Sequence, residues 1–107
     1  MSWSGFNNGT TLGLRGSESG IVMADEEHSG GARITLEREG KTAPFAITCG
    51  VYGWMVHTRF FGTEEEGRGE YAAMRVGLAE LASLPVHDES DFPKMIQAIR
   101  AFVDRFP

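Results

Sequence analysis

The sequence predicts an α+β domain in which an antiparallel meander of about four strands is covered on one face by two C-terminal amphipathic helices. Residues 20–61 are rich in β-branched and aromatic residues and are divided by glycine-containing turns, which favours strands. Residues 63–84 and 91–106 instead repeat apolar residues at helical spacing. Two helical stripes and one apolar sheet face predict a two-layer sandwich, because each amphipathic element must bury its apolar side.

Turn signals at residues 29–31, 40–41 and 50–51 separate the predicted strands. Two-residue hairpin turns at the last two positions would fix the strand register. Ile34 would then face Ile47, and Ile47 would face Trp54, so the large apolar residues of three strands share one face. The opposite, outer face would carry Arg33, Thr35, Glu37, Ala46, Thr48, Met55, His57, Arg59 and Phe61.

The strand at residues 20–24 is expected to be a short edge strand. The run Asp25-Glu26-Glu27-His28 follows it, and such a charged run is not expected to point into a core.

The first predicted helix begins with Thr63-Glu64-Glu65-Glu66, a capping box in which Thr63 accepts from the N3 amide. Its core-facing stripe is expected to be Tyr71, Met74, Leu78 and Leu81. Ser90 or Asp91 is expected to cap the second helix, with Pro93 in its first turn. The second stripe is expected to be Phe92, Ile96, Ile99, Val103 and Phe106.

Residues 1–19, the leader, are expected to form a glycine-rich arm that is flexible or loosely docked, and residues 20–107 the domain itself. Seven of the fourteen glycines fall between Gly5 and Gly31, and such a segment loses much entropy on ordering. Trp3 and Phe6 are the exception, because exposed aromatic residues tend to pack against the domain or a neighbouring subunit.

The charge balance argues against nucleic acid and membrane surfaces as partners. Fifteen acidic residues outnumber ten basic ones, giving a net charge of −5, and the basic residues are scattered. No apolar run reaches the length of a membrane span or signal peptide, and one cysteine cannot form an intrachain disulfide. A cytoplasmic location is therefore expected.

The sequence offers few groups for catalysis. Cys49 and His57 would suit a nucleophile and its base, but the predicted register places them on opposite faces of the sheet. The acidic run at residues 25–28 lacks metal-ligand spacing, and Gly67-Arg68-Gly69 follows three glutamates that would repel a phosphate. We therefore expect no metal site and no cofactor.

Two classes of function remain. The leading hypothesis is a non-enzymatic interaction module, which binds a protein partner or a second copy through the outer sheet face or the leader. Met55, Arg59 and Phe61 are its interface candidates, since aromatic residues, Met and Arg are enriched at interfaces. The rival is an enzyme or small-ligand binder with a pocket around Arg33, Glu37, His57 and Arg59 that the leader closes. An adaptor or immunity-like protein is a third class, which rests on size and acidity alone.

Overall fold

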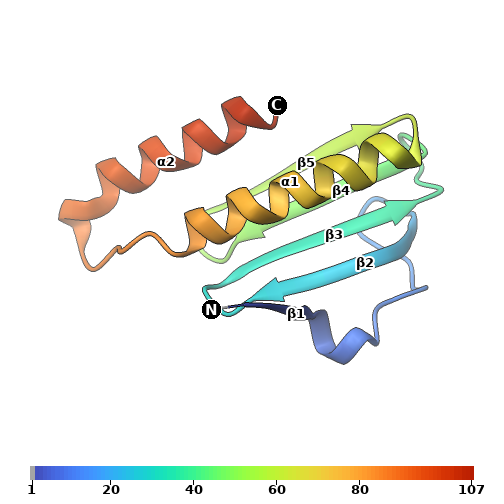
Figure 1. The fold of residues 1–107 in the computed structure, drawn as a ribbon, viewed down its shortest axis with the longest axis horizontal. Helices are drawn as coiled ribbons and strands as arrows, with labels where there is room; N and C mark the ends of the chain where they lie inside the picture. Colours follow the sequence, from blue (N-terminus) through green and yellow to red (C-terminus); the bar gives the residue numbers. More distant parts are fainter. Residues whose placement is uncertain (1) are drawn as a thin grey trace.

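A computed structural model describes residues 2–107 as an antiparallel meander accompanied by two helices (Figure 1). The strands are β1 (Trp3–Gly5), β2 (Ile21–His28), β3 (Ala32–Arg38), β4 (Phe45–Val51) and β5 (Met55–Phe61). The helices are α1 (Glu64–Ala82) and α2 (Phe92–Arg105), with short 3-10 turns η1 (Phe6–Gly9) and η2 (Glu89–Asp91). The predicted α+β class is confirmed, with five strands rather than about four because the leader contributes β1.

The sheet has the order β1-β2-β3-β4-β5, so each strand pairs with its neighbour in sequence. Helix α1 runs across one face of the sheet, whereas α2 lies beside α1 and beyond β5 (Figure 1). None of the helices in residues 2–107 is long and apolar enough to cross a membrane.

The core lies between α1 and the sheet, and this part of the prediction is confirmed. The predicted α1 stripe is buried, as are the inward residues of β3 and β4: Tyr71, Met74, Leu78, Leu81, Ile34, Leu36, Ile47 and Cys49. Helix α1 begins as expected, because the Thr63 side chain accepts a hydrogen bond of 3.3 Å from the Glu66 amide.

The β3–β4 register differs from the prediction by two residues. Ile34 lies opposite Cys49, and Leu36 lies opposite Ile47, because the connection between the strands is longer than the predicted turn at residues 40–41. A displacement by an even number keeps every side chain on its face of the sheet. The predicted faces of β3 and β4 are therefore right although the predicted pairs are wrong.

The β4–β5 register differs by an odd number, and here the predicted face is wrong. The chain turns at residues 52–54 rather than at 50–51, with Gly53 at φ 78° and a 2.9 Å bond from the Trp54 amide to the Val51 carbonyl. This is a three-residue hairpin loop with glycine in the left-handed position. Cys49 consequently lies opposite His57. The side chains of Met55, His57, Arg59 and Phe61 therefore share the helix side of the sheet with Cys49, and those of Val56 and Phe60 take the outer face.

Strand β2 is longer and more central than predicted. It continues through His28 and lies between β1 and β3, with an irregular register between Val22 and Ala24. Asp25 and His28 are buried, contrary to the expectation for the acidic run. The Asp25 and Glu26 carboxylates tolerate burial because they have partners; on the helix side, Glu26 accepts a 2.8 Å hydrogen bond from the Tyr71 hydroxyl.

Helix α2 buries less of its predicted stripe than expected. Phe106 is buried, as is Phe102, which the predicted stripe did not include. Their rings lie so close to Gly77 of α1 that a Cβ there would stand 3.1 Å from Phe106 and 3.2 Å from Phe102. Phe92 and Ile96 are instead exposed. Phe92 and Ile96 are exposed because the N-terminal half of α2 extends past the end of the sheet, with no strand beneath it (Figure 1).

Candidate functional site

The leader crosses the outer face of the sheet and is held there by backbone hydrogen bonds. The Gly13 amide donates to the Val22 carbonyl and the Val22 amide to the Leu14 carbonyl, both at 2.9 Å, and Gly16 bonds Gly20 at the same distance. The expected loose arm is thus a paired segment in this structure. Its two aromatic residues pack against the domain: Trp3 meets His28 edge to face, and Phe6 covers Arg33.

Glu37 of β3 holds the leader against the sheet through hydrogen bonds. Its side chain is fully buried, and its carboxylate accepts hydrogen bonds from the Gly20 amide at 2.9 Å and the Glu18 amide at 3.2 Å. Gly16 rests directly on this carboxylate, where any Cβ would overlap it. Glu37 lies on the outer face as predicted, but its oxygens hold the leader and do not line an open site.

Asp25 is the centre of a buried polar cluster beside Glu37. Its carboxylate accepts two hydrogen bonds from Arg33, at 3.0 Å from Nε and 2.8 Å from Nη2. Thr35 and Thr11 donate to the same carboxylate, at 3.0 and 2.8 Å. The hydrogen bond with Asp25 raises the pKa of Arg33 above its ordinary value, although desolvation opposes it. Asp25 and Arg33 therefore form an ion pair with two hydrogen bonds between the side chains.

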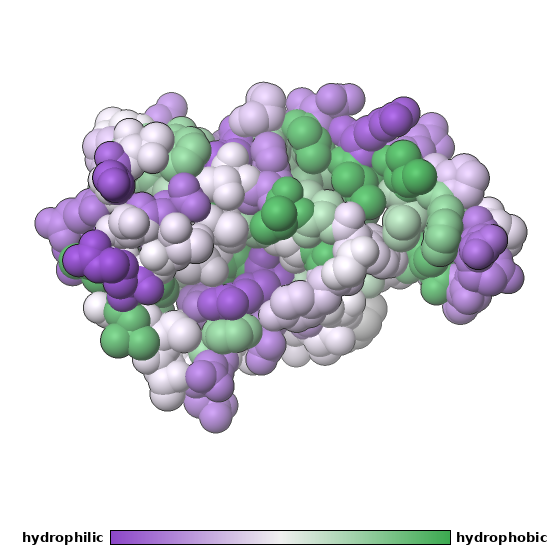
Figure 2. Space-filling view, turned by 180° about the vertical axis from the view of Figure 1, so that it is seen from behind, coloured by the Kyte–Doolittle hydropathy of each residue, from purple (hydrophilic) through white to green (hydrophobic). Residues whose placement is uncertain are grey.

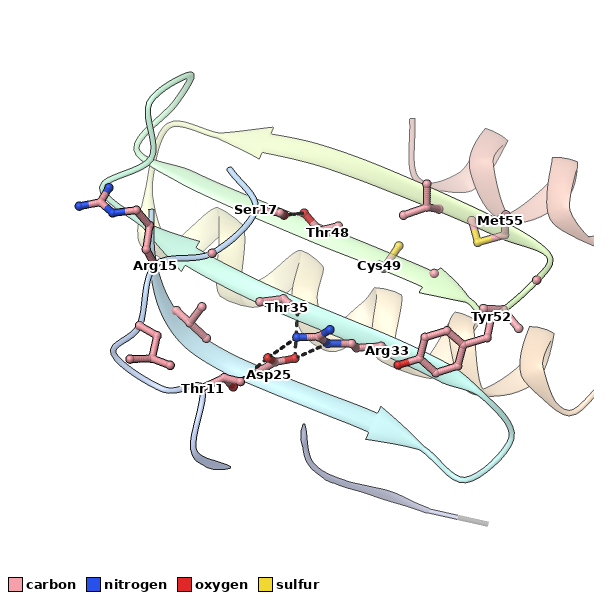
Figure 3. A pocket seen from close by; sticks show the side chains of 17 residues that line it. Thr11, Arg15, Ser17, Asp25, Arg33, Thr35, Thr48, Cys49, Tyr52 and Met55 are labelled. Carbon is pink, nitrogen blue, oxygen red and sulfur yellow. Dashed lines mark hydrogen bonds and ion pairs between the residues drawn. The ribbon is translucent and has the colours of Figure 1, made fainter. Parts of the chain in front are cut away.

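A cavity of about 510 Å³ lies between the leader and the outer faces of β3, β4 and β5 (Figure 3). Asp25, Arg33 and Thr35 lie along one side of the cavity. Ser17 and Thr48 lie along another side, and the hydroxyl oxygens of these two residues are 3.5 Å apart. We call it the leader cavity. Its volume is in the range of small-molecule sites in proteins.

The structure divides the residues that were predicted to form one site. Arg33 lines the leader cavity, but His57 and Arg59 lie on the other side of the sheet. There, His57 Nε2 donates to the Phe106 carbonyl at 2.6 Å, and Arg59 donates to the Pro107 carbonyl at 3.0 Å and to Glu70 at 2.7 Å. Both side chains thus tie the end of α2 to β5.

The predicted interface residues also change place. Phe61 is buried and Met55 is half-buried, both packed with the core. The apolar residues that β5 exposes are Val56, at 75%, and Phe60, at 44%. The predicted turn exchanged the two faces of β5, so the prediction placed Met55 and Phe61 on the outer face instead of Val56 and Phe60.

Sequence reasoning missed Asp25 as the centre of the polar cluster. The signal for it lies in the hairpin around residues 29–31, which brings Asp25 opposite Thr35 and Glu27 opposite Arg33. The predicted strand ended at residue 24, before the acidic run, so the prediction contained neither of these two pairs.

Cys49 lies directly opposite His57, yet its surroundings do not favour a nucleophile. The thiol is buried, and burial raises its pKa to about 12, with Arg59 opposing the shift. The His57 nitrogen Nε2 is already committed to the Phe106 carbonyl. A thiol with so high a pKa holds almost no thiolate at neutral pH.

We expect Cys49 to resist alkylation in the folded protein. The rise in pKa from 9.0 to about 12 lowers the thiolate fraction at neutral pH about a thousandfold, and burial also limits access. Mass spectrometry after timed exposure to iodoacetamide, with and without denaturant, measures both rates. Similar rates in the two conditions would show that the thiol is accessible in the native state.

A second feature is the apolar surface around α2 and the free edge of β5. We call it the α2–β5 surface; its exposed residues are Phe92 and Ile96 of α2 with Val56 and Phe60 of β5. Met95, Ile99 and Val103 of α2 are half-buried. Figure 2 shows hydrophobic residues gathered along the region of α2, at the upper right. Phe92 and Ile96 are 44% and 46% exposed.

These features define a small α+β domain with a leader folded over its outer sheet face, a cavity beneath that leader and an apolar edge. Comparison of the chain with protein-family models, curated proteins and solved structures found no match.

Proposed function

We propose that the protein is a non-enzymatic module that associates with a second copy of itself through the α2–β5 surface. The observation that carries the proposal is the exposed apolar stripe of α2, which extends beyond the last strand of the sheet. Contiguous exposed apolar surface of this kind marks interaction sites in soluble domains.

Strand β5 suits a second copy in particular. It is a seven-residue edge strand whose other side is unpaired in the sheet order, whereas β1, at the opposite edge, has three residues. An antiparallel pair of β5 strands from two copies is self-complementary and obeys a two-fold axis. The added strand would lie in the space that α2 overhangs, so the apolar stripe would cover it.

The side chains of β5 support a specific register. If the two-fold axis passes through Thr58, Val56 of each copy lies opposite Phe60 of the other on the outer face. Both residues are exposed in the single chain, and apolar cross-strand pairs of this type stabilise sheets.

Measured molar mass tests the proposal. Light scattering across the micromolar range should give a dimer of about 23.4 kDa, twice the chain mass of 11.7 kDa. Ile96→Glu and Val56→Lys should each weaken association roughly a hundredfold, because each places an unpaired charge in the contact. Both residues are exposed, so folding should be unaffected.

Two matched controls keep the outcome decisive. Val76→Glu, at an exposed position of α1, should leave the mass unchanged. Leu12→Glu alters an exposed leader residue. A dimer that survives Ile96→Glu but dissociates with Leu12→Glu would place the contact on the leader, and a wild-type monomer would contradict the proposal.

Cysteine crosslinking reads the register directly. Opposing residues of an antiparallel pair have Cα atoms about 4.5–5.5 Å apart, within the range of a disulfide. Thr58→Cys should therefore form an intermolecular disulfide on oxidation, whereas Thr42→Cys, on the exposed β3–β4 loop, should not. Cys49 is buried and needs no replacement.

A further inference from the structure

The leader cavity has a lining with two distinct parts. Apolar side chains form most of the wall, and a few polar groups converge from three strands and the leader (Figure 3). The main apolar contributors are Leu14, Val22, Tyr52 and Val56. A mostly apolar wall with few, fixed polar groups is the usual composition of a small-molecule site.

Two arginines belong to this lining. Arg15 donates to the Ser19 carbonyl at 2.7 Å and points away from the cavity (Figure 3), so Arg33 is the one placed to recognise a charge there. Its Nε and Nη2 bind Asp25, and for Nη1 the structure shows no acceptor anywhere in residues 2–107. The side chain is 38% exposed, and Phe6 stacks on the guanidinium at 3.5 Å, which fixes its orientation. A guanidinium carries five donors, so Arg33 keeps donors to spare after pairing with Asp25.

The acidic group of the cluster is closed to a ligand. The Asp25 side chain has no exposed surface, and four donated hydrogen bonds occupy its carboxylate. Hydroxyl groups of Ser17, Thr48 and Tyr52 supply the remaining polar character of the lining. A cation would therefore find no open carboxylate among these groups, whereas an anion would find a guanidinium and hydroxyl donors.

The geometry points to a binding site for a small carboxylic acid with an apolar or aromatic body, seated in the leader cavity with its carboxylate toward Arg33 Nη1 and its body against the Leu14, Val22 and Tyr52 side chains. This site goes beyond self-association and does not rest on it.

Three matched probes test the inference: phenylpropionate, its neutral amide phenylpropionamide, and the amine phenylpropylamine. Amide proton–nitrogen NMR follows each titration. Phenylpropionate should bind saturably and shift amides at residues 11–17 and 48–56. The amide should bind roughly tenfold more weakly. A hydrogen bond to a charged carboxylate contributes more free energy than one to a neutral amide, and the difference corresponds to about a tenfold change in affinity. The amine should not bind.

Two variants and one control locate the site. Thr48→Trp fills the cavity from β4 and should abolish binding, while Val76→Trp, on the exposed side of α1, should not. Arg33→Lys keeps a cation beside Asp25 but removes the spare planar donors, so the preference for carboxylate over amide should fall toward unity. Arg33→Lys keeps the test decisive if Thr48→Trp does not fold.

The inference is overturned by equal binding of all three probes or by absence of saturable binding. It is also overturned by shifts confined to a second groove, between α1 and α2, which Leu81, Ala98 and Phe102 line. Molar mass measured on the same samples separates this result from self-association. Loss of the dimer with binding intact would contradict only the proposed function.

Discussion

Arg33→Met is expected to lower the free energy of unfolding by about 3 kcal/mol. The change leaves the fully buried Asp25 carboxylate without its cation, and breaking a buried pair from one side typically costs 3–5 kcal/mol. We expect the lower end because the Arg33 side chain is partly exposed. Urea denaturation followed by circular dichroism measures the loss.

The double variant Asp25→Asn with Arg33→Met separates the lost pair from the stranded charge. Because the neutral amide no longer demands a cation, the double variant should regain roughly 1 kcal/mol or more over Arg33→Met. Arg38→Met is the matched control, since the ion pair that Arg38 makes is with Glu39 at the surface. Its effect should stay within about 0.5 kcal/mol. If Arg38→Met proved as costly as Arg33→Met, the buried pair would have no special role.

Glu37→Gln is expected to cost about 2 kcal/mol and to release the leader. The buried carboxylate accepts from the Gly20 and Glu18 amides, and hydrogen bonds to charged groups contribute about 1.5–3 kcal/mol each. A glutamine has no charge to strengthen these bonds. If its oxygen takes the Oε1 position, its Nε2 amide meets the Glu18 N–H, which donates to Oε2 at 3.3 Å. The stability loss should therefore come with faster proteolysis at residues 10–19.

The control for Glu37 is Glu39→Gln, two residues along at an exposed position. It should change neither the stability by more than about 0.5 kcal/mol nor the cleavage of the leader. Cleavage of Glu37→Gln at the wild-type rate would show that backbone pairing alone holds the leader.

The sequence predicted correctly the strands in which the apolar pattern allows only one assignment of side chains to the two faces of the sheet. In β3 and β4 the apolar residues alternate cleanly, so a wrong loop length still left Ile34 and Ile47 on the buried face. Strand β5 has no such alternation: Met55 and Phe61 occupy one face and Val56 and Phe60 the other. The assignment of its two faces therefore depended on the position of the preceding turn alone, and both Gly50 and Gly53 are candidates for the glycine of that turn.

The candidate site was less predictable because it is built from backbone contacts and charge pairs. The Asp25–Arg33 pair requires β2 to continue through the acidic run, which its local composition opposes. The leader cavity exists because backbone groups of the leader pair with Val22 and Gly20 and bond Glu37. Main-chain pairing leaves no side-chain periodicity, so the sequence pattern contained little sign of it.

The simple order of the strands has a consequence for how fast the chain folds. Neighbours in the sheet are also neighbours along the chain, and even the leader pairs with Gly20 and Val22, a few residues away. Folding rates fall as the sequence separation of native contacts grows. Strands β2 to β5 pair through short hairpin loops. The docking of α1 on β3 joins residues that are farther apart along the chain, so it is the step that should limit the rate.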